Sequence, residues 1–127
     1  MLAQSVNSSL YPTWLAHVSD AGTKEAFLYL AGFAATLKSL TCHAQFKGAV
    51  RDFRFLSENG EQPFSFIINK KWLLFYFRLP SVRSGRYNAE SLAGLFPSMN
   101  TNNRGEWTVR ISSLGDATRL VNFLALS

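Results

Sequence analysis

The sequence predicts a single α+β domain, in which an antiparallel meander sheet of about four strands packs on an N-terminal and a C-terminal helix. Apolar residues recur at three- and four-residue steps over residues 23–41, as in a helix, and alternate at every second position over four later segments, as in strands. The expected order is helix, three strands, short helix, strand and helix. A chain of 127 residues that is 47% hydrophobic has enough apolar material for one core.

We divide the chain into an N-terminal segment, residues 1–22, and the α+β domain, residues 23–127. A short helix is expected near Pro12, because proline is tolerated in a first helical turn. The main helix follows, and either Asp20 or Thr23 can cap its start. Its apolar stripe is expected to face the core. Its small residues would also allow a homodimer contact, and these are Ala31, Gly32, Ala34 and Ala35.

Three strands are expected to form the meander, at residues 51–57, 64–69 and 72–79. Asn59-Gly60 predicts a tight turn between the first two, because both residues tolerate the positive φ that such a turn requires. Lys70-Lys71 is expected to turn the chain into the third strand. Pro80 would end that strand, because proline has no N–H for the sheet.

The rest of the chain is predicted to add one strand and two helices. The expected elements are a basic loop at residues 80–87, a short helix capped by Asn88 and running through Phe96, a polar loop at residues 98–105 and a strand at residues 106–112. Ser113 and Asp116 have the spacing of a capping box, with Asp in place of Glu, which predicts the start of the last helix.

Two segments resemble a known type of small bacterial domain. Residues 75–80 follow the pattern apolar-Tyr-Phe-Arg-apolar-Pro, and residues 107–111 read Trp-Thr-Val-Arg-Ile before a capped helix. In these segments and in its order of elements, the chain is similar over residues 25–126 to the MmcQ/YjbR-like double-wing domains. In that group a tryptophan stands on the strand before the last helix, the position that Trp107 takes here. The resemblance implies a DNA-binding role and carries over no catalytic residue.

Positive charge is concentrated in the predicted strand region. The formal net charge is +5, and residues 47–112 hold ten cationic residues against five anionic ones, whereas the rest of the chain is balanced. A basic surface favours nucleic acid, an anionic membrane or an acidic protein as partner. The alternative is a basic surface without any partner.

The predicted interface is the sheet face opposite the helices, together with the adjoining loops. Arginine forms forked hydrogen bonds to phosphate, and aromatic rings stack on bases. We therefore predict a non-enzymatic binding module with nucleic acid as its partner. The residues expected to contact phosphate are Arg54, Lys70, Lys71, Arg78, Arg83, Arg86, Arg104 and Arg110, and those expected to stack are Trp72 and Tyr76.

Two alternatives remain open. An accessory, immunity or inhibitor protein would use the same face, through Trp72, Leu74 and Tyr76, to bind a protein partner. A metal-dependent nuclease would need a carboxylate cluster, for which Asp52 and Glu106 are candidates in the strand region. The sequence contains no acidic-x-Lys triplet of the kind that a metal-nuclease core uses, so this alternative is the weaker one.

No cofactor, metal site or catalytic residue is predicted. His17 and His43 lie on opposite sides of the main helix, and the single Cys42 is expected at the end of that helix as a small apolar residue. One cysteine cannot form an intramolecular disulfide, which is typical of the reducing cytoplasm. The longest apolar run, residues 26–37, is too short to cross a bilayer, so we expect a cytoplasmic protein that has no membrane contact.

Overall fold

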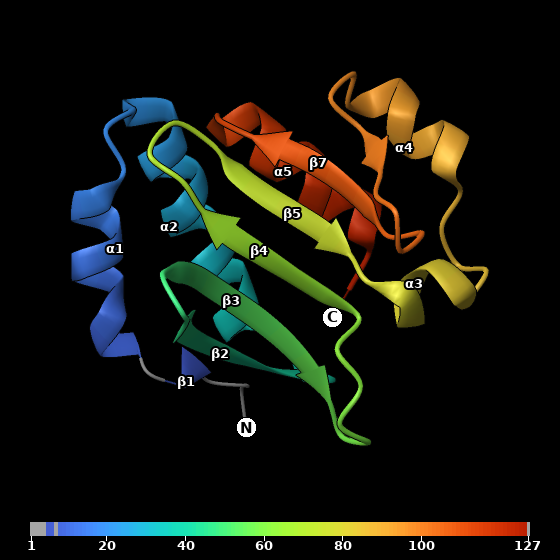
Figure 1. Ribbon diagram of the computed structural model, residues 1–127, viewed down its shortest axis with the longest axis horizontal. Helices are drawn as coiled ribbons and strands as arrows, with labels where there is room; N and C mark the ends of the chain where they lie inside the picture. The colour runs from blue at the N-terminus through green and yellow to red at the C-terminus, as the bar shows by residue number, and fades with distance from the viewer. Residues whose placement is uncertain (1–4, 7, 127) are drawn as a thin grey trace.

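The computed structural model describes residues 5–6 and 8–126, and these form the predicted α+β fold (Figure 1). In chain order the elements are β1 (Ser5–Val6), the 3-10 helix η1 (Ser8–Leu10), α1 (Tyr11–His17), α2 (Ala21–Ala35), β2 (Leu40–Lys47), β3 (Val50–Ser57), β4 (Phe64–Ile68), β5 (Leu73–Phe77), α3 (Leu79–Arg83), α4 (Ala89–Leu95), β6 (Asn100–Thr101), β7 (Trp107–Ile111) and α5 (Leu114–Leu124).

All strands belong to one sheet with the order β1-β2-β3-β4-β5-β7-β6. Strands β2 to β5 form an antiparallel meander, β7 pairs with β5, and β6 pairs with β7. Strand β1 pairs with β2 in parallel. The four strands predicted from sequence are confirmed, and the sheet extends beyond them at both edges.

Strand β2 was not predicted. The helix α2 ends at Ala35 rather than near residue 41, and the chain then enters β2 at Leu40. Cys42 therefore lies on a strand and not at a helix end, and burial raises the pKa of its thiol to about 12. The alternation in β2 is hard to recognise because two of its core positions, Cys42 and Ala44, carry small side chains.

A layer of phenylalanine side chains joins the sheet to the helices. Alternate residues of β3, β4 and β5 place Phe53, Phe55, Phe64, Phe66, Phe75 and Phe77 on one face, all of them buried. The rings of Phe53 and Phe66 stack with centroids 4.6 Å apart. Phe27 of α2 and Leu120 of α5 pack on this layer, and Trp14 of α1 belongs to the same core. Burying each such side chain stabilises the fold by about 1.5–3 kcal/mol.

The start of α2 is tied to the turn between β4 and β5. Asp20 caps the helix by accepting hydrogen bonds from the Thr23 backbone N–H at 3.0 Å and from its hydroxyl at 2.8 Å. The Thr23 hydroxyl also lies 2.9 Å from the carbonyl oxygen of Lys71. Of the two capping residues expected, Asp20 is the cap. Thr23 links the helix to the sheet.

The segment after β5 differs from the predicted loop at residues 80–87. Residues 79–83 form the helix α3, with Pro80 in its first turn, where proline is favoured. The buried Ser81 hydroxyl donates to the carbonyl oxygen of Arg78 at 2.9 Å. The predicted short helix is present as α4, and its cap Asn88 accepts from the Ser91 backbone N–H at 2.9 Å.

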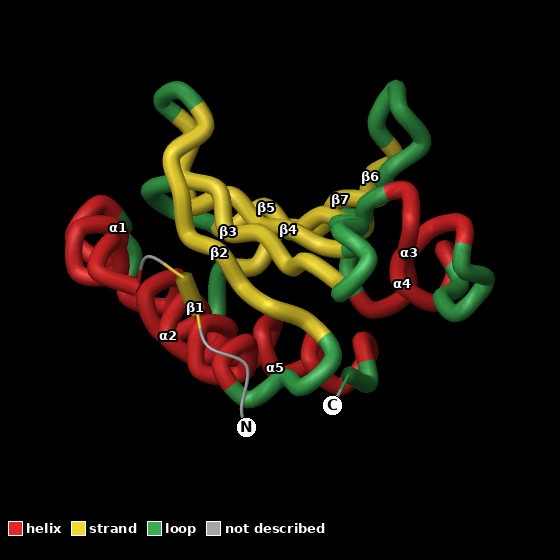
Figure 2. The backbone as a smooth tube through the Cα atoms, turned by 90° about the horizontal axis from the view of Figure 1, so that it is seen from below, coloured by secondary structure: helices red, strands yellow, loops and turns green. Residues whose placement is uncertain are grey.

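The described helices leave one face of the sheet uncovered. Figure 2 shows α1, α2 and α5 on the same side, with α3 and α4 beyond one end of the sheet. From the other side rise the β2–β3 turn and the β6–β7 loop, near opposite ends of the view. We call this uncovered side the open face. Within the part of the chain that the structure describes, no helix has the length and apolar character that crossing a bilayer requires.

Helix α2 packs closely on the segment before α5 at Gly22, so the structure predicts that a larger residue is not tolerated there. A Cβ at this position would lie 2.6 Å from the carbonyl oxygen of Ser112, so the backbone would have to shift. We expect Gly22→Ala to lower the free energy of unfolding, measured by urea denaturation, by about 1–3 kcal/mol.

Gly32→Ala is the matched control in the same helix. No atom lies within 4 Å of a Cβ added at Gly32, and alanine favours a helix over glycine. This variant should be more stable than the wild type by about 0.5–1 kcal/mol. Equal gains in both variants would contradict the close approach at Gly22.

Candidate functional site

A hollow of about 360 Å³ lies on the open face, lined by residues of the β2–β3 turn and of the β6–β7 loop. We call it the trough. Strands β3, β4 and β5 form its floor, and the two connections form its walls. The lining residues are Lys47, Val50, Asp52, Ser65, Ile67, Tyr76, Arg78, Asn102, Asn103, Arg104 and Glu106.

One wall of the trough is built around Asn102. Its side-chain oxygen accepts hydrogen bonds from the backbone N–H of Arg104 at 3.0 Å and of Glu106 at 2.9 Å. Gly105, with φ of 84°, allows the chain to turn back into β7. This local network fixes the loop and leaves the Arg104 side chain exposed at its tip.

Glu106 connects this wall to the floor. The residue is 5% exposed, and its carboxylate lies 2.7 Å from Nε of Arg78, while Nδ2 of Asn102 donates to the other carboxylate oxygen at 3.1 Å. Such a charge-assisted pair positions both side chains. The Arg78 guanidinium also lies 5.5 Å from the centre of the Tyr76 ring. One arginine thus holds an acid on one side and covers an aromatic ring on the other.

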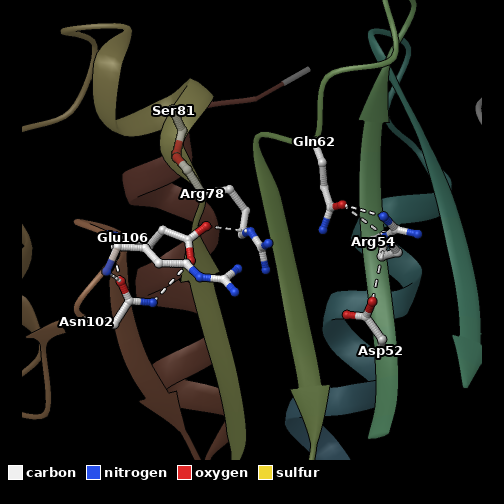
Figure 3. A network of polar contacts seen from close by, with 8 residues as sticks. Asp52, Arg54, Gln62, Arg78, Ser81, Asn102 and Glu106 are labelled. Atoms are coloured by element: carbon white, nitrogen blue, oxygen red, sulfur yellow. Dashed lines mark hydrogen bonds and ion pairs between the residues drawn. The ribbon is translucent and has the colours of Figure 1, made fainter. Parts of the chain in front are cut away.

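A second polar group lies across β4 from the first (Figure 3). Arg54 on β3 donates through Nε and Nη2 to the side-chain oxygen of Gln62, at 3.0 and 2.8 Å. Its Nε also lies 3.6 Å from the carboxylate of Asp52. Because Arg54 makes its short contacts with Gln62, the carboxylate of Asp52 is only loosely paired.

Burial acts against the charge of Asp52, whose residue is 7% exposed. Desolvation raises the pKa of this carboxyl above its ordinary value, although Arg54, Arg78 and Lys47 pull the pKa in the opposite direction. Desolvation likewise raises the pKa of Tyr76. The floor of the trough is therefore a poorly hydrated place that still holds a carboxyl and a phenol.

Ser65 lies between these two groups. It pairs with Arg54 on β3 and with Tyr76 on β5, so its side chain points to the open face. The residue is 1% exposed, and its hydroxyl oxygen has no hydrogen-bond partner among the residues that the structure describes.

Six of the ten predicted interface residues share this side of the molecule: Arg54, Trp72, Tyr76, Arg78, Arg104 and Arg110. The guanidinium of Arg110 lies over the Trp72 ring, 4.4 Å from its centre. Both aromatic rings of the predicted interface are thus in contact with an arginine.

Of these six residues, Tyr76, Arg78 and Arg104 line the trough, and the other four predicted residues lie elsewhere. Lys70 and Lys71 form the β4–β5 turn, where the Lys70 carbonyl oxygen accepts from the Ser19 backbone N–H at 2.8 Å. Arg83 is exposed at the end of α3, and Arg86 donates to the carbonyl oxygen of Ala125 after α5. These cations lie at other edges of the molecule.

Sequence reasoning left Lys47 out of the interface. It ends β2, the strand that was not predicted, and its exposed side chain lines the trough opposite Arg104. Asp52 and Glu106, the carboxylates considered for a nuclease, line the same hollow, each beside an arginine. Across the described ranges, 5–6 and 8–126, no three His, Cys, Asp or Glu residues are grouped so that they could hold a metal ion.

Another hollow of about 360 Å³ lies near the β3–β4 loop and α3, and its lining includes Pro63, Phe64, Pro80, Tyr87 and Leu126. It is the more apolar of the two, and its polar groups are largely engaged. Ser81 bonds to Arg78 and Arg86 to Ala125. The trough combines three cations with the Tyr76 ring and with the Ser65 hydroxyl, which has no partner among the described residues, so it is the better candidate site.

Fold and site together define an α+β protein with an open, predominantly basic sheet face. No protein-family model matches the chain, and no curated protein or solved structure matches it either. The residues of the trough are therefore the basis for a proposed function.

The buried carboxyl of Asp52 gives a prediction for stability against pH. Its pKa is higher in the folded than in the unfolded chain, so ionised Asp52 costs folding free energy at neutral pH. That cost disappears once the pH falls below the unfolded value of about 4. We expect Asp52→Asn to raise the free energy of unfolding at pH 7, and the gain to shrink toward zero as the pH falls to about 4.

Urea denaturation at several pH values measures this difference. Glu58→Gln is the matched control, because it removes an exposed carboxylate from the loop after the same strand. It should change stability little at either pH. A loss of stability in Asp52→Asn at pH 7 would show that the Arg54 contact outweighs the cost of burial.

Proposed function

We propose that this protein is a non-enzymatic module that binds nucleic acid, with the trough and the adjoining open face as its interface. The observation that carries the proposal is the excess of cations on the one face of the sheet that the described helices leave free. Lys47, Arg54, Arg78, Arg104 and Arg110 outnumber Asp52 and Glu106 there.

The two walls of the trough supply the cations best suited to contact phosphate. Lys47 and Arg104 are exposed, and among the described residues no side-chain hydrogen bond or ion pair engages either of them. A phosphate backbone that follows the trough would pass between them and release its condensed counterions. Arg54 and Arg78, which already hold acids or amides, would serve mainly to position the floor.

The aromatic residues favour a single strand over a duplex. Trp72 and Tyr76 are half-buried on the floor side of the open face. Such rings can stack only on bases that are not already stacked in a double helix. The resemblance to double-wing domains remains a prediction, and it would fit DNA as the partner.

An interaction with another protein is the second candidate. Leu74 on β5 pairs with Ile67, which also lines the trough, and Trp72 lies two residues before Leu74, so the open face becomes more apolar near the start of β5. An accessory or inhibitor protein would dock through such a patch. Its binding would resist salt and would be lost on Trp72→Ala.

The test of nucleic-acid binding is fluorescence anisotropy with labelled single- and double-stranded oligonucleotides over a series from roughly 50 to 200 mM salt. We expect the single strand to bind more tightly, with an affinity that falls steeply as salt rises. The double variant Lys47→Gln/Arg104→Gln should reduce the log–log salt slope by about 1.4, because each lost phosphate contact on a single strand removes about 0.7.

Lys24→Gln/Lys38→Gln is the matched control. It removes the same charge from exposed lysines of the helical layer and of the segment before β2. This variant should keep the wild-type slope. If the two double variants behave alike, binding follows net charge and the trough is not the interface. Failure of the wild type to bind either oligonucleotide at about 50 mM salt would overturn the proposal.

A further inference from the structure

The floor of the trough contains a hydroxyl group that the fold does not use. Ser65 is 1% exposed, and its Oγ has no hydrogen-bond partner within the described chain. A buried hydroxyl without a partner weakens a fold, whereas an apolar residue of similar size would not. Because Ser65 lines the hollow and points to the open face, a ligand in the trough would satisfy it.

Two further polar groups lie beside Ser65. Tyr76 stands directly opposite Ser65 on β5, and no hydrogen bond of its hydroxyl is found within the described chain. Asp52 is a diagonal neighbour on β3, and within the described residues the one ion pair of its carboxylate is that with Arg54 at 3.6 Å. In an antiparallel sheet such neighbours are close enough to contact one small ligand together.

We infer that Asp52, Ser65 and Tyr76 form a pocket that takes a single nucleobase carrying an amino group on its Watson–Crick edge. This inference rests on the proposed function, and it names which part of the nucleic acid enters the trough. The hollow of about 360 Å³ falls in the range of small-ligand sites. Lys47 and Arg104 at the rim would meet the phosphate that the nucleotide carries.

The preference for an amino group follows from the carboxylate of Asp52. A carboxylate only accepts hydrogen bonds, and the 4-amino group of cytosine donates to such a group. The hydroxyls of Ser65 and Tyr76 can donate to the neighbouring ring nitrogen and carbonyl oxygen of cytosine. Thymine instead presents one N–H between two carbonyl oxygens, and one of these would face the carboxylate.

The experiment compares oligo-dC with oligo-dT of the same length by fluorescence anisotropy at one fixed salt concentration and pH 7.5. These strands differ in the base edge and the thymine methyl group but carry the same backbone charge. We expect wild-type protein to bind oligo-dC about tenfold more tightly than oligo-dT. Equal affinity for both strands, with the steep salt dependence intact, would overturn the base pocket and leave the proposed function standing.

Asp52→Asn tests the role of the carboxylate. The carboxamide offers a donor as well as an acceptor, so it can pair with either base edge. We expect this variant to bind oligo-dC and oligo-dT within about threefold of each other, since it loses the discrimination that a single good base contact supplies. If this variant still binds oligo-dC tenfold more tightly than oligo-dT, Asp52 is not the group that distinguishes the two bases.

Ser65→Ala separates a binding role from a structural one. Removing an unpaired buried hydroxyl should leave the free energy of unfolding unchanged or higher. Affinity for oligo-dC should fall, and affinity for oligo-dT should change less. A variant that loses stability, with both affinities unchanged, would show that the hydroxyl serves the fold.

Free nucleotides distinguish a base within a strand from a base on its own. Isothermal titration with cytidine and thymidine monophosphates should show the same order of affinity, more weakly than the strands. Binding of cytidine monophosphate without binding of either oligonucleotide would support the pocket and overturn strand binding. If neither the monophosphates nor the strands bind, the pocket is wrong as well.

Discussion

The packing of one phenylalanine layer against α2 and α5 is the constraint on which the rest of the structure depends. Strand residues alternate between two faces, so the positions that carry Phe53, Phe66 and Phe75 commit one face to the helices. The opposite positions are then free to be polar. Because the helices of the described chain gather on the phenylalanine side, the other side stays open (Figure 2). The open face thus follows from how the core is built.

The open face keeps its charge in a partly balanced form. Arg78 is held by Glu106, and Arg54 by Gln62, so these guanidinium groups are positioned before any ligand arrives. Preorganisation of this kind reduces the entropy lost on binding. Asp52 and Ser65 are different. Burial disfavours the charged form of Asp52, and the hydroxyl of Ser65 has no hydrogen-bond partner among the described residues. A face that served stability alone would carry apolar residues at these two positions.

The sequence predicted those parts of the fold that depend on strong alternation. The strands rich in phenylalanine and the capped last helix are present. The alternation of strand residues between two faces was enough to predict that Arg54, Tyr76 and Arg110 share one face. Strand β2 escaped prediction because small residues weaken its pattern. The trough escaped because Asn102 and Gln62 lie in loops. Their contacts depend on how those loops fold back on the sheet, which no periodicity encodes.

Both edges of the sheet end in very short strands, Ser5–Val6 on one side and Asn100–Thr101 on the other. A long unpaired edge offers a row of free backbone groups to which a further chain can add a strand, and this is a common route to aggregation. A strand of two residues has few free backbone N–H and C=O groups with which an added strand could pair. Short edge strands of this kind offer fewer backbone groups to a further chain, so they disfavour edge-to-edge addition at both ends of the sheet.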